Sequence, residues 1–210
     1  MFQKEIEIIC KQITERAKAG KRMMIGVAGP PAAGKSTLAE LLVDRLNESA
    51  DTNAALVPMD GYHLDNEALD ALNLRERKGA PQTFDADGFV ALVSQISGSS
   101  DAVSYATFDR TNDRTVPNSA SVAANTDIVV VEGNYLLLNT EPWSQLKALF
   151  DLSIFIRPSI KTLEERLIQR WLSYGFEQEA AEKKALSNDI PNARTILDQS
   201  SQADLTFGGL

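Results

Sequence analysis

The chain has 210 residues, of which 43% are hydrophobic and 24% are charged, and its formal net charge is −8. This composition is typical of one soluble domain with a single sizeable core. The negative charge argues against nucleic-acid partners, because such proteins need clustered Lys and Arg to displace the counterions of phosphates. One cysteine excludes an internal disulfide, and a single histidine leaves no Cys/His cluster for structural zinc.

Residues 1–7 contain acidic side chains, which secretory and transit peptides avoid. No run in the sequence approaches the ~18 apolar residues of a membrane span. We therefore expect a cytoplasmic protein with no membrane partner.

The first half of the chain predicts two helices and two strands. Apolar residues recur every three or four positions in residues 2–17, which predicts an amphipathic helix closed by a cap at Gly20. The apolar run 23–28 predicts the first strand, and the leucine-rich segment 37–46 predicts a helix behind it. Residues 54–59 predict a short buried strand whose carboxyl end lies where ligands bind in open α/β sheets.

The middle of the chain is less regular. Apolar periodicity is lost in residues 61–85, where 65–72 allow one short helix, and a loop this long in a compact domain is usually functional. Residues 85–98 predict a capped helix. Residues 103–108 alternate like a strand, and the polar segment 109–114 after them indicates a hairpin or a projecting loop.

The last part of the chain alternates strands with helices. The clearest buried strand is 127–133, which is apolar on both faces. The other expected elements are a short crossover helix at 142–149, a strand at 150–157, a long helix capped by Ser159, helices at 177–187 and 192–200, and a last strand at 203–207. Strands separated by helices predict an α/β domain with a parallel sheet covered on both faces. We expect one domain over residues 1–210.

Residues 29–36 read Gly-Pro-Pro-Ala-Ala-Gly-Lys-Ser, which fits the P-loop (Walker A) pattern between a strand and a helix. Gly29 and Gly34 allow the backbone amides to point at a phosphate chain. Lys35 can reach the β- and γ-phosphates of ATP or GTP, and Ser36 offers a hydroxyl to Mg²⁺. The alternative is a plain Gly/Pro turn, but this spacing arises by chance in roughly 1% of chains of this length. The predicted nucleotide-binding residues are Gly29, Pro30, Pro31, Ala32, Ala33, Gly34, Lys35, Ser36 and Thr37.

Two acidic residues follow buried strands. Asp60 is the candidate general base that accepts the proton of an acceptor hydroxyl, and its alternative role is a turn or cap aspartate. Glu132 lies at the tip of a buried strand, where an unpaired charge has few structural uses. We therefore predict that Glu132 and Ser36 hold Mg²⁺.

Arg166 and Arg170 are four residues apart on one face of a predicted helix, so they can converge on phosphate oxygens from the side opposite Lys35. Their alternative role is to pair on the surface with Glu164 and Glu165.

Four residues of the polar loops are candidates for binding the acceptor: His63, Arg77, Lys78 and Arg110. The three basic side chains suit an anionic or polyhydroxylated acceptor, with solvated loop charge as the alternative. His63 lies beside Asp60, and local packing is an equally simple role for it.

Several segments together resemble a known family. They are Gly29 to Ser36, Met59-Asp60-Gly61-Tyr62-His63, Arg77-Lys78-Gly79-Ala80-Pro81, Thr83-Phe84-Asp85, Phe108-Asp109-Arg110 and Val131-Glu132-Gly133-Asn134-Tyr135-Leu136-Leu137-Leu138. From Met23 to the C-terminus, the chain looks like the phosphoribulokinase/uridine kinase superfamily. It is most similar to a bacterial branch near pantothenate kinase that is often labelled candidate fructose transport system kinase.

This resemblance implies a P-loop NTPase three-layer fold and ATP-dependent phosphorylation of a hydroxyl. It also implies that Asp60 is the base, that 61–85 and 108–116 are acceptor loops, and that about 166–190 form a helical lid bearing arginines. The acceptor loops do not match uridine kinase or phosphoribulokinase closely. Asp60-Gly61-Tyr62-His63 only approximates the pantothenate kinase pattern Asp-Gly-Phe-His.

We predict a kinase that uses Mg²⁺ and ATP to phosphorylate a small molecule, with the acceptor and a homodimer left open. The main alternative is a nucleotide-binding regulatory NTPase without an acceptor. A GTPase should carry Asn-Lys-x-Asp, and no such segment occurs in the sequence. A hydrolase that drives a partner protein is the third interpretation.

Overall fold

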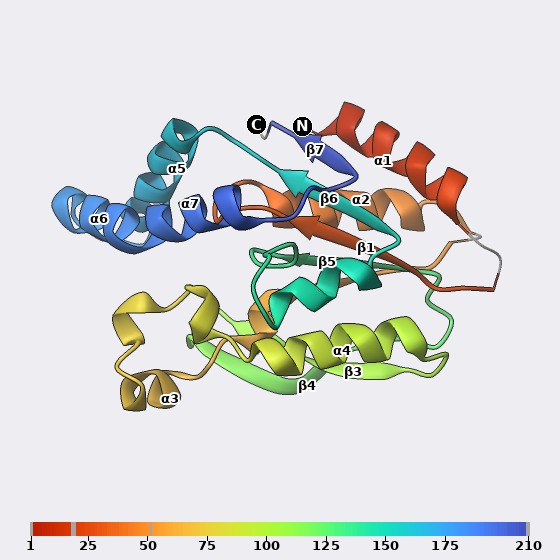
Figure 1. Cartoon of the computed structure of the whole chain (residues 1–210), viewed down its shortest axis with the longest axis horizontal. Coiled ribbons are helices and arrows are strands. Elements are labelled where there is room, and N and C mark those ends of the chain that lie inside the picture. The colour runs from red at the N-terminus through yellow and green to blue at the C-terminus, as the bar shows by residue number, and fades with distance from the viewer. Residues whose placement is uncertain (1, 18–19, 51, 209–210) are drawn as a thin grey trace.

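A five-stranded parallel sheet with the order β2-β5-β1-β6-β7 forms the centre of the molecule (Figure 1). The structure is a computed structural model that describes residues 2–17, 20–50 and 52–208. The strands are β1 (Met23–Ala28), β2 (Ala54–Pro58), β5 (Ile128–Gly133), β6 (Leu152–Ile156) and β7 (Leu205–Phe207). Every residue of β1, β5 and β6 is buried, as expected for parallel strands covered on both faces.

The two faces of the sheet support two separate cores. Met23, Ile25 and Val27 of β1 face one core, while Met24 and Ala28 face the other, because successive side chains of a strand point to opposite sides. The first core is covered by α1 (Gln3–Arg16), α2 (Lys35–Asn47), α5 (Ile160–Ser173) and the start of α7 (Ile190–Gln199). The second is covered by α4 (Ala86–Gly98) and the 3₁₀ segment Trp143–Leu149. The predicted three-layer α/β fold is confirmed.

Side-chain caps explain where α4 and α5 begin. Asp85 accepts a hydrogen bond from the backbone N–H of Gly88, and Ser159 accepts one from that of Thr162, so both predicted N-caps are confirmed. The predicted glycine cap of α1 is wrong. The helix ends at Arg16, and Ala17 leaves the helical conformation, three residues before Gly20.

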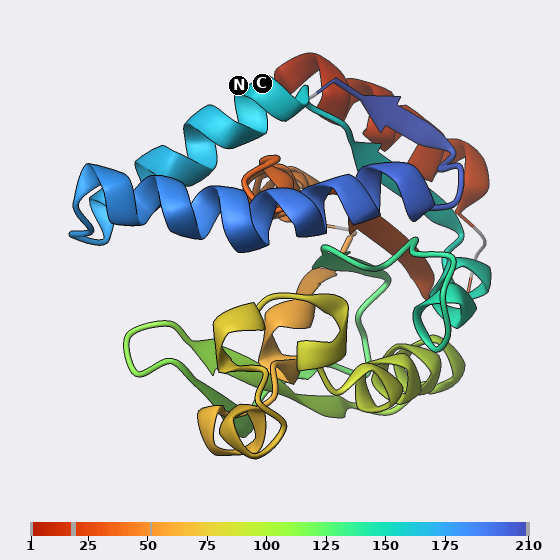
Figure 2. The ribbon, with the colours of Figure 1, turned by 60° about the vertical axis from the view of Figure 1, so that its left-hand side comes forward.

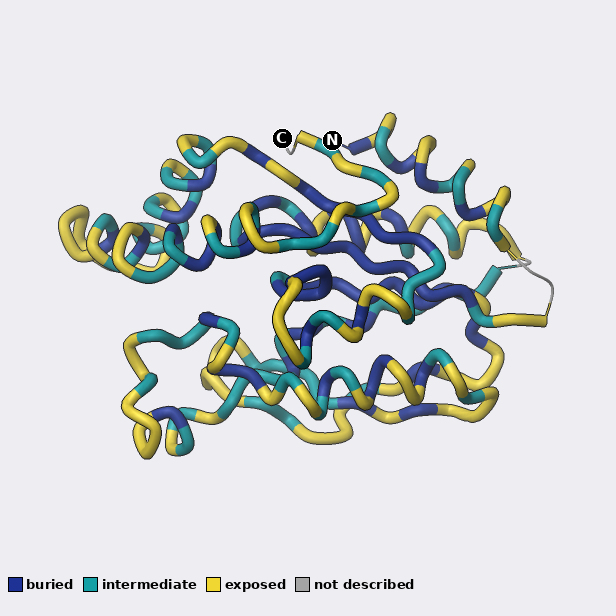
Figure 3. The backbone as a smooth tube through the Cα atoms, in the orientation of Figure 1, coloured by how far each residue is buried: buried dark blue, intermediate teal, exposed yellow. Residues whose placement is uncertain are grey.

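A small second sheet lies outside the main one. Strands β3 (Val103–Asp109) and β4 (Arg114–Val122) form an antiparallel hairpin, as the polar segment between them indicates. The strand β4 itself was not predicted, because Pro117 and its polar neighbours hide the alternation. The hairpin lies beside α4 (Figure 1) and is more exposed than the central strands (Figure 3).

The segment after β2 is irregular, as predicted. It holds α3 (Asn66–Ala71) and three 3₁₀ turns at Met59–Tyr62, Arg75–Arg77 and Pro81–Thr83. Above it in Figure 2 lies a helical arm made of α5, α6 (Gln178–Lys184), the π-helical segment Ala185–Asp189 and α7. Within the described residues, no helix combines the length and apolarity needed to cross a membrane.

Candidate functional site

The P-loop joins the end of β1 to the start of α2. Three of its residues have a positive φ: Gly29 (150°), Ala32 (60°) and Gly34 (98°). Gly29 has no substitute, because a Cβ there would lie 2.5 Å from the carbonyl oxygen of Ile156. Ala32 adopts a left-handed conformation that residues with a Cβ seldom use, and such conformations concentrate at ligand-binding sites.

Lys35 lies inside the curve of this loop. Its side chain is only 7% exposed, and Nζ donates a hydrogen bond to the carbonyl oxygen of Pro30 at 2.9 Å. Burial lowers the pKa of Lys35, while the carboxylates of Glu132 and Asp60 act in the opposite direction. Both predicted acidic residues are therefore close enough to Lys35 to act on its charge.

Glu132 is 6% exposed and lies opposite Val27 on the neighbouring strand β1. Burial raises the pKa of Glu132, whereas the charge of Lys35 and a hydrogen bond with the Ser36 hydroxyl lower it. Among residues 2–17, 20–50 and 52–208, no cluster of three or more His, Cys, Asp or Glu side chains forms a metal site. One carboxylate and one hydroxyl suit Mg²⁺, which usually takes its other ligands from phosphates and water.

Asp60 lies in the 3₁₀ turn that follows β2, at the same edge of the sheet as the P-loop. Its Oδ2 accepts a hydrogen bond from Nη2 of Arg110, which comes from the tip of the β3–β4 hairpin. The side chain of Asp60 is 24% exposed and that of Arg110 is 59% exposed. The structure thus brings together a predicted base and a predicted acceptor-binding residue that are 50 positions apart.

His63 packs between two aromatic rings. Its ring centroid is 4.0 Å from that of Phe84 and 4.7 Å from that of Phe108. Nδ1 lies 2.8 Å from the carbonyl oxygen of Asp60, and since a carbonyl can only accept, Nδ1 carries the proton. Burial lowers the pKa of His63 and so favours the neutral ring. The local packing role is present, and contact with an acceptor stays a prediction.

Arg77 and Lys78, the two basic residues of loop 61–85 that were predicted to bind the acceptor, have different surroundings. Lys78 donates to Asn66 Oδ1 at 2.8 Å and to Asp113 Oδ1 at 2.7 Å, so it ties the loop to the hairpin. The Arg77 guanidinium reaches the carbonyl oxygen of Ser187 in the helical arm at 3.5 Å. Acceptor binding by either residue stays a prediction, but Lys78 already has partners that account for its position.

Arg166 and Arg170 do not make the surface ion pairs that were their alternative role. Arg166 Nη1 donates to the carbonyl oxygen of Ala32 in the P-loop at 3.2 Å. Arg170 Nε donates to the hydroxyl of Tyr174 at 3.1 Å, and its charge helps to lower the pKa of Lys35. Neither arginine forms an ion pair with Glu164 or Glu165 in the described part of the chain.

Two side-chain contacts of the helical arm were not predicted from the sequence. Asn188 Nδ2 donates to the carbonyl oxygen of Lys78 at 3.0 Å, which links the π-helical segment to the acceptor loop. Trp171 Nε1 donates to Asp189 Oδ2 at 2.7 Å and links α5 to the same segment. Burial raises the pKa of Asp189. No spacing in the sequence signals these pairs, although π-helical segments often occur at functional sites.

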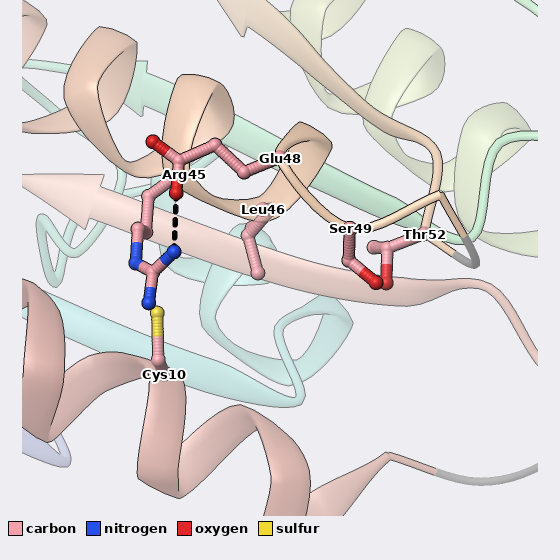
Figure 4. Close-up of a pocket in the computed structure, with 6 residues that line it drawn as sticks. All are labelled: Cys10, Arg45, Leu46, Glu48, Ser49 and Thr52. Atoms are coloured by element: carbon pink, nitrogen blue, oxygen red, sulfur yellow. Dashed lines mark hydrogen bonds and ion pairs between the residues drawn. The ribbon is translucent and has the colours of Figure 1, made fainter.

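A separate hollow lies between α1 and the last turn of α2, at the other end of α2 from the P-loop (Figure 4). It is lined by Cys10, Arg45, Leu46, Glu48, Ser49 and Thr52. Burial raises the pKa of the Cys10 thiol, which disfavours the reactive thiolate. This hollow contains no residue of the candidate site.

Comparison with known proteins agrees with this geometry. The model of the phosphoribulokinase/uridine kinase family matches residues 24–209. Protein YggC of Escherichia coli (strain K12) is 36% identical over 186 residues, which are 88% of this chain and 77% of YggC. The candidate uridine kinase C227.14 of Schizosaccharomyces pombe is 36% identical over 187 residues, which are 85% of this chain and 79% of that protein.

The fold is shared as well. The crystal structure of a candidate fructose transport system kinase from Silicibacter sp. TM1040 superimposes with a TM-score of 0.91 and 38% identity. The match covers 96% of this chain and 98% of that one. The chain belongs to the phosphoribulokinase/uridine kinase family and is a P-loop kinase.

Proposed function

We propose that the protein transfers the γ-phosphate of ATP to a hydroxyl group of a small molecule. The observation that carries this proposal is the position of Asp60. Its carboxylate lies at the same edge of the sheet as the P-loop, near enough to act on the charge of Lys35, and it is held by a residue of the hairpin. In a protein that only bound a nucleotide, Asp60 would instead be a metal or water ligand, and that role needs no contact with the hairpin.

The reaction needs a base, cationic side chains that stabilise the negative charge of the phosphoryl group, and ligands for the metal ion. Asp60 accepts the proton as the O–H bond of the acceptor breaks and the new O–P bond forms. The bond from the γ-phosphorus to the bridging oxygen breaks, and ADP leaves with that electron pair. Lys35, Arg166 and Arg170 meet the negative charge on the phosphoryl group during transfer. Mg²⁺ neutralises charge on the β- and γ-phosphates when it is bound, and Ser36 and Glu132 are the residues that would hold it.

Residues 166–190, which form the middle part of the helical arm, serve as the lid in this proposal. Arg166 already contacts the P-loop, and Asn188 contacts the acceptor loop, so the arm touches both sides of the site. The acceptor loops are 61–85 and 108–116. A cytoplasmic location and a homodimer stay predictions.

The test compares Asp60→Asn with the wild type in a screen for ADP release over sugars, nucleosides, pantothenate and vitamin precursors. The amide keeps the shape of Asp60 but cannot take the proton, so turnover with the best acceptor should fall by about 10²- to 10⁴-fold. Affinity for Mg²⁺–ATP, measured by titration calorimetry, should change little. Asp70→Asn is the matched control, because Asp70 is an exposed carboxylate of the same segment that pairs with Arg75.

A regulatory NTPase predicts the opposite result. In that case no acceptor would stimulate ADP release by the wild type, and Asp60→Asn would weaken Mg²⁺–ATP binding because Asp60 would be a metal or water ligand. These two results together would contradict the kinase proposal.

A further inference from the structure

The β3–β4 hairpin is attached to the segment that carries Asp60 at three places. Tyr105 donates its hydroxyl to the carbonyl oxygen of Leu56 at 2.9 Å, and Thr115 donates to that of His63 at 2.9 Å. Between them the backbones touch, since a Cβ on Gly61 would lie 1.9 Å from the carbonyl oxygen of Ala106. Because these contacts lie before and after Asp60 in the sequence, they fix the position of the hairpin relative to Asp60.

The turn that carries Arg110 is itself ordered. Asp109 accepts hydrogen bonds from the backbone N–H groups of Thr111 and Asn112, both at 3.1 Å, and from Nδ2 of Asn112. Asp113 is held by Lys78 and Asn66. A turn fixed at both ends gives Arg110 a defined starting point, so its reach to Asp60 does not depend on a mobile loop.

Arg110 binds only one oxygen of Asp60. Its Nη2 donates to Oδ2, whereas Oδ1 makes no hydrogen bond with any residue the structure describes. A carboxylate oxygen that stays available can accept the proton of an acceptor hydroxyl. The contact therefore orients the carboxylate without occupying the oxygen that the reaction needs.

The guanidinium also has donors to spare. Arginine carries five N–H donors, and the described residues use one of them. The side chain is 59% exposed, so the other donors are open to a bound molecule next to Asp60 Oδ1. An acceptor whose hydroxyl meets Oδ1 would place a neighbouring oxygen against this guanidinium.

From these contacts we propose that Arg110 is a positioning and specificity-determining residue. This proposal rests on the proposed kinase function. It orients Asp60, and it binds a second oxygen of the acceptor that is one or two carbons from the phosphorylated hydroxyl. The acceptor class is accordingly a polyol or a hydroxy acid, and simple alcohols are poor acceptors.

The experiment pairs enzyme variants with acceptor analogues. The probes are glycerol with 1-propanol, D-glycerate with 4-hydroxybutyrate, pantothenate with its 2-deoxy analogue, and the best acceptor of the wild type with analogues that lack every oxygen within two carbons of the phosphorylated hydroxyl. kcat/KM is measured for wild type, Arg110→Ala, Arg110→Lys and the control Arg45→Ala. Arg45 lies near the end of α2, outside the candidate site, and its exposed ion pair with Glu48 contributes little.

The wild type should favour the complete acceptor over its analogue by about 10- to 100-fold, the range for a hydrogen bond to a charged group. Arg110→Ala should lose activity by a similar factor and should discriminate by less than about 3-fold, because the partner of the removed oxygen is gone. Arg110→Lys should lie between them, since an ammonium keeps the charge but not the planar fork. Arg45→Ala should stay within about 2-fold of the wild type.

Two results would overturn the inference alone. One is a wild type whose best acceptor has no oxygen within two carbons of the phosphorylated hydroxyl, and the other is an active Arg110→Ala that discriminates as the wild type does. If no acceptor stimulates ADP release by the wild type, the proposed function is overturned instead, and this inference with it.

Discussion

The phosphate-binding half and the acceptor half of the candidate site are held in different ways. The P-loop is one continuous stretch between β1 and α2, and its geometry comes from its own backbone. The acceptor half depends on contacts between distant positions, such as Arg110 with Asp60, 50 residues apart, and Asn188 with Lys78, 110 residues apart. One half is thus a local structure, while the other exists only once the chain has folded, so mutations should be able to damage either half alone.

Lys35→Ala should have the largest effect and should act on the phosphate half. The ammonium meets charge where the β- and γ-phosphates join, so kcat should fall by about 10³-fold or more. ADP release with the best acceptor measures the loss. Lys161→Ala, on the exposed side of α5, is the control and should behave as the wild type. Undiminished turnover in Lys35→Ala would remove this residue from the mechanism.

Replacing both Arg166 and Arg170 by Ala tests whether the lid belongs to the phosphate half. We expect kcat to fall by about 10²-fold while the Kd of Mg²⁺–ATP changes by less than about 3-fold, because charge on the moving phosphoryl group is greatest in the transition state. Glu164→Gln with Glu165→Gln is the matched control. If turnover stays normal in the arginine variant and only the melting temperature drops, the pair is structural.

Gly61→Ala should damage the acceptor half and leave the other intact. The added Cβ meets the carbonyl oxygen of Ala106 and must push the hairpin away from Asp60. We expect a loss of roughly 1–3 kcal/mol in the free energy of unfolding, the usual cost of overpacking. Acceptor-dependent turnover should fall by about 10-fold or more, with Mg²⁺–ATP affinity within about 2-fold.

Gly98→Ala serves as the control for this change, because a Cβ at Gly98 would have no atom within 4 Å. It should cost nothing measurable in turnover. Equal acceptor kinetics in Gly61→Ala and the wild type would show that the hairpin does not set the position of Asp60.

Asp189→Asn should have the smallest effect, visible in the pH dependence of stability. Burial raises the pKa of Asp189 above its ordinary value of 3.8, so the folded state binds this proton more tightly than the unfolded state. The contribution of Asp189 to stability is therefore present below pH ~4 and is lost as the pH rises through the folded pKa. The melting temperature of Asp189→Asn relative to the wild type should increase over that window and then level off.

The exposed Asp198 of α7 provides the control variant, Asp198→Asn. A difference in melting temperature between Asp189→Asn and the wild type that stays constant from acidic to neutral pH would contradict the raised pKa.

The same contrast explains what the sequence could predict. The P-loop could be predicted, and so could the places of Asp60 just after β2 and of Glu132 near the end of β5, because local spacing and strand ends determine where these residues lie. The partners of Lys78 and the Trp171 contact with Asp189 were not, because they join segments that only tertiary packing brings together. The glycine cap of α1 failed for a simpler reason, since a glycine near a helix end permits a left-handed cap without requiring one.

The helical arm contacts both halves, through Arg166 at Ala32 and through Asn188 at Lys78. A change in this arm that accompanies binding on one side must therefore appear in the binding free energy on the other. Thermodynamic linkage makes that coupling reciprocal, so whatever factor ATP adds to the affinity for the acceptor, the acceptor adds to the affinity for ATP.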